Sequence, residues 1–156
     1  MTAEPSYVEV QRFPRLWVGG LFGAAGVFVV LVAPFSLLSW AILVVVGAVL
    51  FSITLRTEVR ADGVYVKLWP IHRSFRHVPW TEVERVEAIE YNSLTRAGGW
   101  GLRMTANEVT YNVGGSDGVS IERDEKRDVL LGSGRAEELA AAIDAEREDS
   151  RVDTAA

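Results

Sequence analysis

The apolar and polar positions divide the chain into two parts. Forty consecutive residues, from Leu16 to Leu55, include no Asp, Glu, Lys, Arg or His. Pro34 lies near the middle of this stretch, and proline both interrupts a helix and disfavours helical backbone at the residue before it. The pattern therefore predicts two apolar helices, at residues 16–33 and 36–55, joined by a minimal turn.

Each of these helices is about as long as a membrane span requires. A spanning helix needs roughly 20 apolar residues, so residues 16–55 are expected to form a two-helix transmembrane hairpin with the lipid bilayer as a partner. Arg12 and Arg15 precede the hairpin, Arg56 and Arg60 follow it, and the turn carries no charge. The positive-inside rule then predicts a multi-pass protein of the cell membrane with both termini in the cytoplasm.

Small residues recur at helical spacing within the two apolar segments. Gly19 and Gly23 are four residues apart in the first helix, as are Ala48 and Ser52 in the second. Small residues at this spacing let helix backbones approach closely. Two interpretations follow, a homodimer through this face or packing of the two helices of one hairpin, and we favour the second because a short turn forces that contact.

After Arg56 the period of the apolar pattern changes to two. Apolar and polar residues alternate over residues 64–69, and turn-forming residues separate further short runs of the same kind. About seven antiparallel strands are therefore expected, from candidate runs at residues 54–60, 64–69, 73–78, 86–91, 102–106, 109–113, 119–123 and 128–132. Residues 81–90 are ambiguous, because Thr81 and Glu84 have the spacing of a capping box. We favour a turn at residues 80–83 that leads into a strand.

The last predicted element is a helix. Ser133 or Gly134 can cap a helix that begins near Arg135, and acidic residues in its first turn suit the helix dipole. Its apolar positions follow a period of three and four residues, which predicts one face packed on a sheet; they are Ala136, Leu139, Ala140 and Ile143. Residues 149–156 are expected to form a flexible tail.

Two local segments resemble a known family. These are Val78–Val83, which leads into a predicted strand, and Gly132–Leu139, which leads into the final helix. Together with the preceding hairpin they resemble the membrane-anchored bacterial and archaeal PH-like domain proteins, a functionally uncharacterised family. The resemblance implies a membrane α-hairpin plus an α+β domain, a small antiparallel PH-like barrel or sandwich with a C-terminal helix. The implied division is a cytoplasmic N-terminal segment at 1–15, the hairpin at 16–55, the PH-like domain at 56–148 and the tail.

Composition narrows the chemistry. The chain has 16 Lys and Arg against 21 Asp and Glu, no cysteine and two histidines. This balance argues against nucleic acid as a partner, and the absence of cysteine excludes thiolate metal sites, disulfides and a cysteine nucleophile. His72 and His77 are five residues apart, which places them on opposite faces of a strand. We predict no catalytic residue, no metal site and no cofactor.

A basic and aromatic segment is the main candidate binding site. It comprises His72, Arg73, Phe75, Arg76 and His77. Basic residues interleaved with aromatic ones near a membrane could bind anionic lipid headgroups. The alternative, which we favour, is a solvated edge strand whose charges prevent pairing with another sheet.

Trp100, in a glycine-rich loop, is a further candidate, either as a cover for one end of the domain or as an exposed binding anchor. The function expected from these features is a non-enzymatic protein-interaction or scaffold module held at the cytoplasmic face of the membrane, with a protein partner. The alternatives are an anionic phospholipid headgroup sensor and an accessory subunit of a membrane enzyme or transporter.

Overall fold

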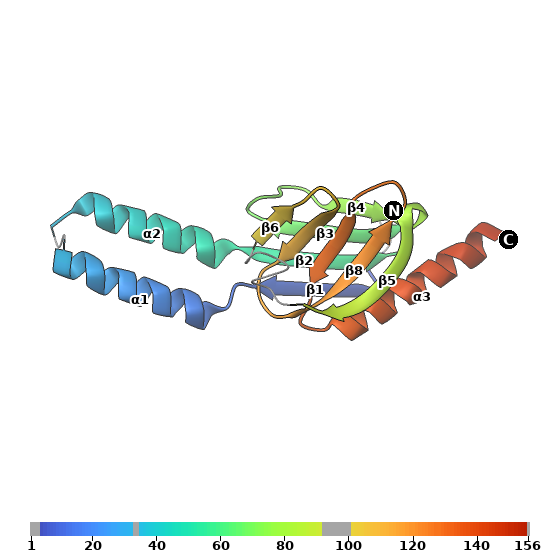
Figure 1. Cartoon of the computed structure of the whole chain (residues 1–156), viewed down its shortest axis with the longest axis horizontal. Helices are drawn as coiled ribbons and strands as arrows, with labels where there is room; N and C mark the ends of the chain where they lie inside the picture. Colours follow the sequence, from blue (N-terminus) through green and yellow to red (C-terminus); the bar gives the residue numbers. More distant parts are fainter. Residues whose placement is uncertain (1–3, 33–34, 92–100, 156) are drawn as a thin grey trace.

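The computed structural model describes residues 4–32, 35–91 and 101–155 of the chain, and Figure 1 shows their arrangement. The protein is α+β, with two sheets, a helical hairpin at one end and a C-terminal helix at the other. The helices are α1 (Arg15–Val32), α2 (Leu37–Ser52) and α3 (Ala136–Ala155). The strands are β1 (Tyr7–Arg12), β2 (Thr54–Arg60), β3 (Gly63–Trp69), β4 (Arg76–Pro79), β5 (Val83–Glu90), β6 (Gly101–Met104), β7 (Glu108–Asn112), β8 (Asp117–Arg123) and β9 (Asp128–Gly132).

The first sheet has the strand order β1-β2-β3-β4 and is antiparallel throughout. The turn between β2 and β3 depends on Gly63, whose backbone has a φ of 149°. A Cβ atom there would lie 2.3 Å from the carbonyl oxygen of Val78 on β4, so only glycine permits this close approach of the strands.

The second sheet has the order β5-β8-β9-β7-β6 and contains a parallel pair, β7 with β9, in which Val109 lies opposite Val129. The prediction that all strands pair antiparallel is therefore wrong for this pair. The connection from β7 to β8 crosses over β9, so β7 and β8 are consecutive in sequence but are not neighbours in the sheet. Only about two thirds of consecutive strands are neighbours, and the alternating pattern carries no information on direction.

The two sheets and α3 share one core, in the arrangement of a small sandwich. Val59 and Val64 come from the first sheet and Ile121 from the second, and all three are fully buried. Leu139 and Ile143 of α3 are also fully buried, as the predicted apolar stripe required. The helix continues to Ala155, so the flexible tail expected after residue 148 is wrong for residues 149–155.

Strand β1 is an element that the sequence patterns did not reveal. It pairs with β2, from Tyr7 opposite Val59 to Arg12 opposite Thr54. The helical hairpin is therefore an insertion between two paired strands of the sheet. Both ends of the hairpin are fixed to the sandwich by that pairing.

A buried carboxylate anchors β1 to the start of α3. Glu9 accepts hydrogen bonds from the Ser133 hydroxyl at 2.6 Å and from the backbone N–H of Gly134 at 3.0 Å. The Ser133 hydroxyl in turn accepts from the N–H of Arg135 at 3.0 Å, in the turn that leads into α3 at Ala136. Gln11 adds a 2.6 Å bond to the carbonyl oxygen of Gly132.

The ambiguous segment after Pro79 is resolved in favour of a turn and a strand. Trp80–Glu82 form one turn of 3-10 helix, and β5 starts at Val83. The Trp80 indole N–H donates to the carbonyl oxygen of Ala61 at 2.9 Å, which holds this turn against the β2–β3 connection.

The predicted membrane hairpin is wrong as a membrane element. The two apolar helices form close to their expected positions, but α1 has 18 residues and α2 has 16. At about 1.5 Å per residue they reach about 27 and 24 Å, against roughly 30 Å of hydrocarbon. Among the described residues, no helix combines the length and the apolar character needed to cross a membrane. The expected transmembrane, multi-pass localisation and the resemblance to a membrane-anchored family are both corrected by this finding.

Candidate functional site

The two helices of the hairpin contact each other through one narrow seam. The least exposed positions of α1 recur at three- and four-residue intervals from Val18 to Val29, and those of α2 from Ser39 to Leu50. At the seam, Gly47 lies against the Phe22 ring, where a Cβ atom would be 3.2 Å from Cε1. Gly47 therefore lets α2 approach the aromatic side chain closely.

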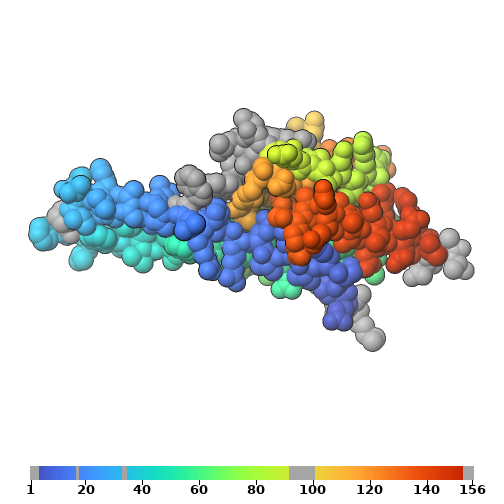
Figure 2. All heavy atoms as spheres, turned by 90° about the horizontal axis from the view of Figure 1, so that it is seen from below, coloured from blue at the N-terminus to red at the C-terminus, as the bar shows by residue number. Residues whose placement is uncertain are grey.

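Outside the seam, the hairpin exposes large apolar side chains. Leu21, Phe28 and Val45 are 65%, 64% and 60% exposed. In Figure 2, α1 and α2 project beyond the sandwich, with neither sheet covering them in this view. Monomeric proteins rarely expose contiguous apolar surface of this kind, and such surfaces mark interaction sites.

The small residues singled out in the sequence do not form the seam. Gly19, Gly23 and Ala48 are exposed, and a Cβ atom on either glycine would meet no other atom within 4 Å. Ser52 donates to the carbonyl oxygen of Val49 in its own helix at 2.7 Å. The favoured interpretation, in which these residues pack the two helices of one hairpin together, does not describe this structure.

The basic and aromatic segment separates onto two faces of the first sheet. On the outer face, His77 stacks on Tyr65 with ring centroids 4.4 Å apart, and Phe75 meets the edge of the same ring. The guanidinium of Arg60 lies 4.6 Å from the Tyr65 centroid. These contacts make a layer of cations and aromatic rings, while Arg73 is exposed before β4.

The inner face opens into a cavity of about 300 Å³ between β4 and the β7–β9 pair. His72 and Arg76 line it from one side. Arg123, the last residue of β8, and Arg127, in the turn between β8 and β9, line it from the other. Val66, Val78, Val109, Val129, Tyr111, Met104 and part of His77 complete the lining. No carboxylate lines this cavity among the described residues.

Burial in the wall of this cavity changes the pKa of two titratable side chains, His72 and Tyr111. His72 is 7% exposed, its ring packs edge-on against Tyr111 at 5.7 Å, and its Nδ1 atom has no hydrogen-bond partner among the described residues. Burial, with a smaller contribution from the Arg76 guanidinium, lowers the pKa of His72. Burial likewise raises the pKa of the Tyr111 phenol, against the opposing effect of Arg76 and Arg123.

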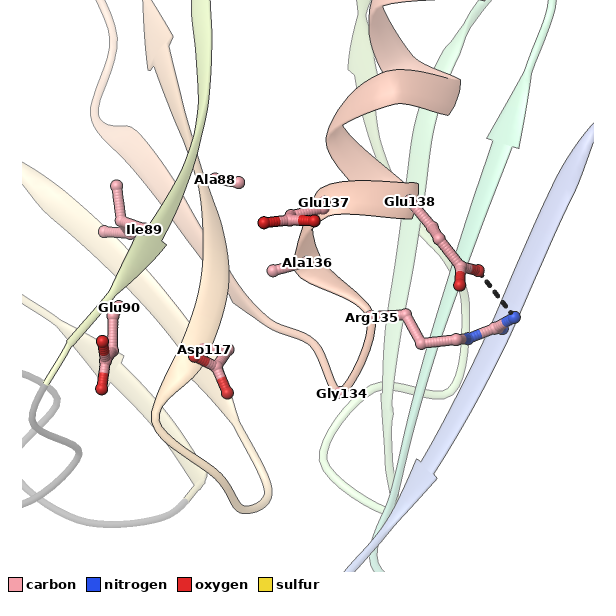
Figure 3. Close-up of a pocket in the computed structure, with 9 residues that line it drawn as sticks. All are labelled: Ala88, Ile89, Glu90, Asp117, Gly134, Arg135, Ala136, Glu137 and Glu138. Atoms are coloured by element: carbon pink, nitrogen blue, oxygen red, sulfur yellow. Dashed lines mark hydrogen bonds and ion pairs between the residues drawn. The ribbon is translucent and has the colours of Figure 1, made fainter.

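A second hollow, shown in Figure 3, has the opposite charge. It occupies about 440 Å³ between the end of β5, the start of β8 and the first turn of α3. Glu137 points toward the strands, whereas Arg135 and Glu138 turn away and pair with each other at 3.2 Å. Glu90 and Asp117 complete an acidic lining. Within the described ranges, no group of three or more His, Asp or Glu side chains is placed to hold a metal ion.

The binding residues predicted from the sequence therefore fall in different places in the structure. His72 and Arg76 meet in the basic cavity, Phe75 and His77 belong mainly to the outer layer, and Trp100 lies outside the described residues. Arg123 and Arg127 were missed, because they lie about fifty residues further along the chain. Arg123 ends a predicted strand and Arg127 lies in the predicted turn that follows it, but nothing in the spacing linked that turn to β4.

Comparisons with known proteins add no assignment. No protein family, no curated protein and no solved structure matches this chain.

Proposed function

We propose that the chain is a non-enzymatic protein-interaction module whose helical hairpin binds the hairpin of a second copy. The observation that carries this proposal is the apolar outer surface of α1 and α2, which the sandwich leaves exposed. Burying apolar surface is favourable by roughly 25 cal/mol per Å². Two hairpins packed together make a four-helix bundle, in which each covers the exposed side chains of the other.

Two features support a second copy as the partner. The hairpin has no charged side chain between Leu16 and Leu55, so two copies approach without charge repulsion. The open face at Gly19, Gly20 and Gly23 has no atom within 4 Å of the point where a Cβ would stand, which lets another helix come close. Each copy then carries its sandwich outside the bundle.

The test is to co-express two copies that carry different affinity tags, purify through one tag and probe for the other. Light scattering then measures the mass of the purified species against 17.2 kDa for one chain. We expect both tags in a species of twice that mass. A single chain at every concentration, or a continuous range of large aggregates, contradicts the proposal.

The geometry supplies a variant without the interaction surface. Residues 14–52 are replaced by Asn-Gly, which joins Phe13 to Ile53 immediately beyond the Arg12–Thr54 pair. Asn-Gly favours the two-residue turn of an antiparallel hairpin, and Phe13 and Ile53 keep their packing on the core. This variant is expected to be folded and to elute as a single chain.

A point variant isolates the glycine face. Gly23→Leu adds bulk where the single chain has open space, so the fold should tolerate it while the approach of a second helix is blocked. We expect association to weaken by about tenfold or more, equivalent to at least ~1.4 kcal/mol. Ala41→Leu adds side-chain bulk to the exposed surface of α2, outside the glycine face, and should have a smaller effect if the glycine face is where the second helix comes closest.

A further inference from the structure

The basic cavity between β4 and the β7–β9 pair carries an inference that is independent of the hairpin. Three arginines and two histidines contribute to its lining, and no Asp or Glu of the described chain does. The chain as a whole has a net charge of −5. A concentration of positive charge against that balance marks the cavity as a place for an anion.

Two of the three guanidinium groups are available to a ligand. Arg123 is held by Glu82 at 3.3 Å, but Arg76 and Arg127 form no ion pair with any described side chain. Residues 1–3, 33–34, 92–100 and 156 include no Asp or Glu. Arg123 and Arg127 also line an adjoining depression, which contains the carboxylates of Glu125 and Asp128 together with Lys126. Among the described residues, Arg76 and Arg127 are therefore the two guanidinium groups of this cavity that no ion pair occupies.

The number of charges points to a phosphate group. A phosphate monoester carries about −1.5 to −2 charges at pH 7, which matches two guanidinium groups, whereas a carboxylate carries one. Guanidinium also matches phosphate oxygens in a bidentate geometry. His72 contributes a ring that is more than nine-tenths buried in the same wall, with its Nδ1 atom unpartnered among the described residues.

The rest of the lining sets the size and character of the ligand. Val66, Val78 and Val129 form an apolar floor, closed on one side by Tyr111. The volume of about 300 Å³ lies at the small end of ligand pockets. We propose that this cavity binds a phosphate monoester carrying a small apolar group, with the phosphate between Arg76 and Arg127 and the apolar group over the valine floor.

The experiment measures binding to the full-length chain by calorimetry at constant ionic strength. The probes are phenyl phosphate, inorganic phosphate and benzoate. Phenyl phosphate should bind most tightly, inorganic phosphate about tenfold more weakly because it leaves the floor empty, and benzoate more weakly than phenyl phosphate because it carries a single charge. Absence of phenyl phosphate binding, or equal affinity for benzoate, overturns the proposal.

Variants locate the site. Arg76→Gln and Arg127→Gln should each weaken phenyl phosphate binding by about tenfold or more. Without ligand, each should raise the thermal midpoint at low salt, because it removes like-charge repulsion across the cavity. Arg85→Gln on β5, where the arginine is exposed and paired with Glu87 at 3.4 Å, is the charge-matched control and should leave binding unchanged. An equal effect of all three variants overturns the assignment to this cavity.

The same phosphate chemistry could come from a soluble metabolite or from a lipid headgroup, and a last arm separates the two. Vesicles of phosphatidylcholine with and without phosphatidic acid, whose headgroup is a phosphate monoester, are sedimented with the chain. Binding that requires phosphatidic acid and is lost in Arg127→Gln assigns the lipid source. Phenyl phosphate binding without such sedimentation assigns the soluble source.

Discussion

The hairpin and the sandwich differ in how far their large apolar side chains are exposed to solvent. In the sandwich, Leu139 and Ile121 are fully buried among strands of both sheets and α3. In the hairpin, Phe28 and Leu21 lie mainly in solvent, because the two helices share only one seam. A domain core is closed by elements that cover one another, whereas a pair of helices leaves most of its surface uncovered. The contrast is between a core that is closed within the chain and an apolar surface that is left open, which the proposed self-association would cover.

The largest expected effect on stability comes from comparing one substitution in the sandwich with one in the hairpin. Leu139→Ala removes a fully buried side chain and should lower the free energy of unfolding by about 2–5 kcal/mol. Phe28→Ala, at an exposed position, should change the stability of the single chain by less than about 0.5 kcal/mol and instead weaken self-association. Chemical denaturation at low protein concentration measures the first effect, and light scattering measures the second. Equal destabilisation by both variants would remove the contrast.

Substitution of the buried Glu9 tests what holds β1 to the start of α3. Glu9→Leu leaves the Ser133 hydroxyl and the Gly134 N–H without their acceptor, and should cost about 1–3 kcal/mol. Hydrogen exchange should show faster exchange at β1 and at the first turn of α3. The exposed Glu84→Leu serves as control. Protection unchanged at both segments would show that β1 is held by its pairing with β2 alone.

Substitution in the seam separates the internal contact of the hairpin from its outer surface. Gly47→Leu places a side chain against the Phe22 ring and should destabilise the contact of α1 with α2 by about 1–3 kcal/mol. Circular dichroism and proteolysis within the helices report this change. Gly23→Leu, which meets open space, should leave both readouts unaltered. The reverse order of effects would place the seam on the other face of α1.

An alkaline pH dependence belongs to the sandwich. Burial raises the pKa of both Tyr7 and Tyr91 from 10.0 to about 12, with the Glu9 charge adding to the effect on Tyr7. The unfolded chain loses these protons near pH 10, and the folded chain retains them. Stability is therefore unaffected below about pH 10 and falls as the pH rises from about 10 through 12. Denaturation at about pH 9 and pH 11 measures the loss, which Tyr91→Phe should reduce.

Histidine provides a second pH dependence on the acid side. Because the pKa of buried His72 is lowered, the unfolded chain takes up the proton first. Stability should be complete above the unfolded value of about 6.5 and decline below it. His72→Gln should flatten the change in unfolding free energy between about pH 7 and pH 5. A slope identical to that of the unsubstituted chain would assign the acid sensitivity to other groups.

Local patterns determined much of the secondary structure. The uncharged segment predicted two helices, the alternation at 64–69 predicted β3, and the stripe ending at Ile143 predicted the buried face of α3. These features depend on neighbours within a few residues, since helix and strand periods of about 3.6 and 2 are visible in any short window. The order of charged and apolar residues also located the apolar segment at residues 16–55.

Tertiary structure alone decided the remainder. Strand β1 exists because β2 offers it a partner, and its inward positions include polar Glu9, which no apolar pattern could reveal. The parallel pairing of β7 with β9 joins residues far apart in sequence, and one cavity is lined by both Arg76 and Arg127. The lengths of α1 and α2, which overturned the membrane prediction, depend on where the sheet begins: Thr54 and Leu55 belong to β2 and pair with β1 instead of extending the helix. Pairing of this kind is a contact between distant segments, and a sequence read in local windows does not contain it.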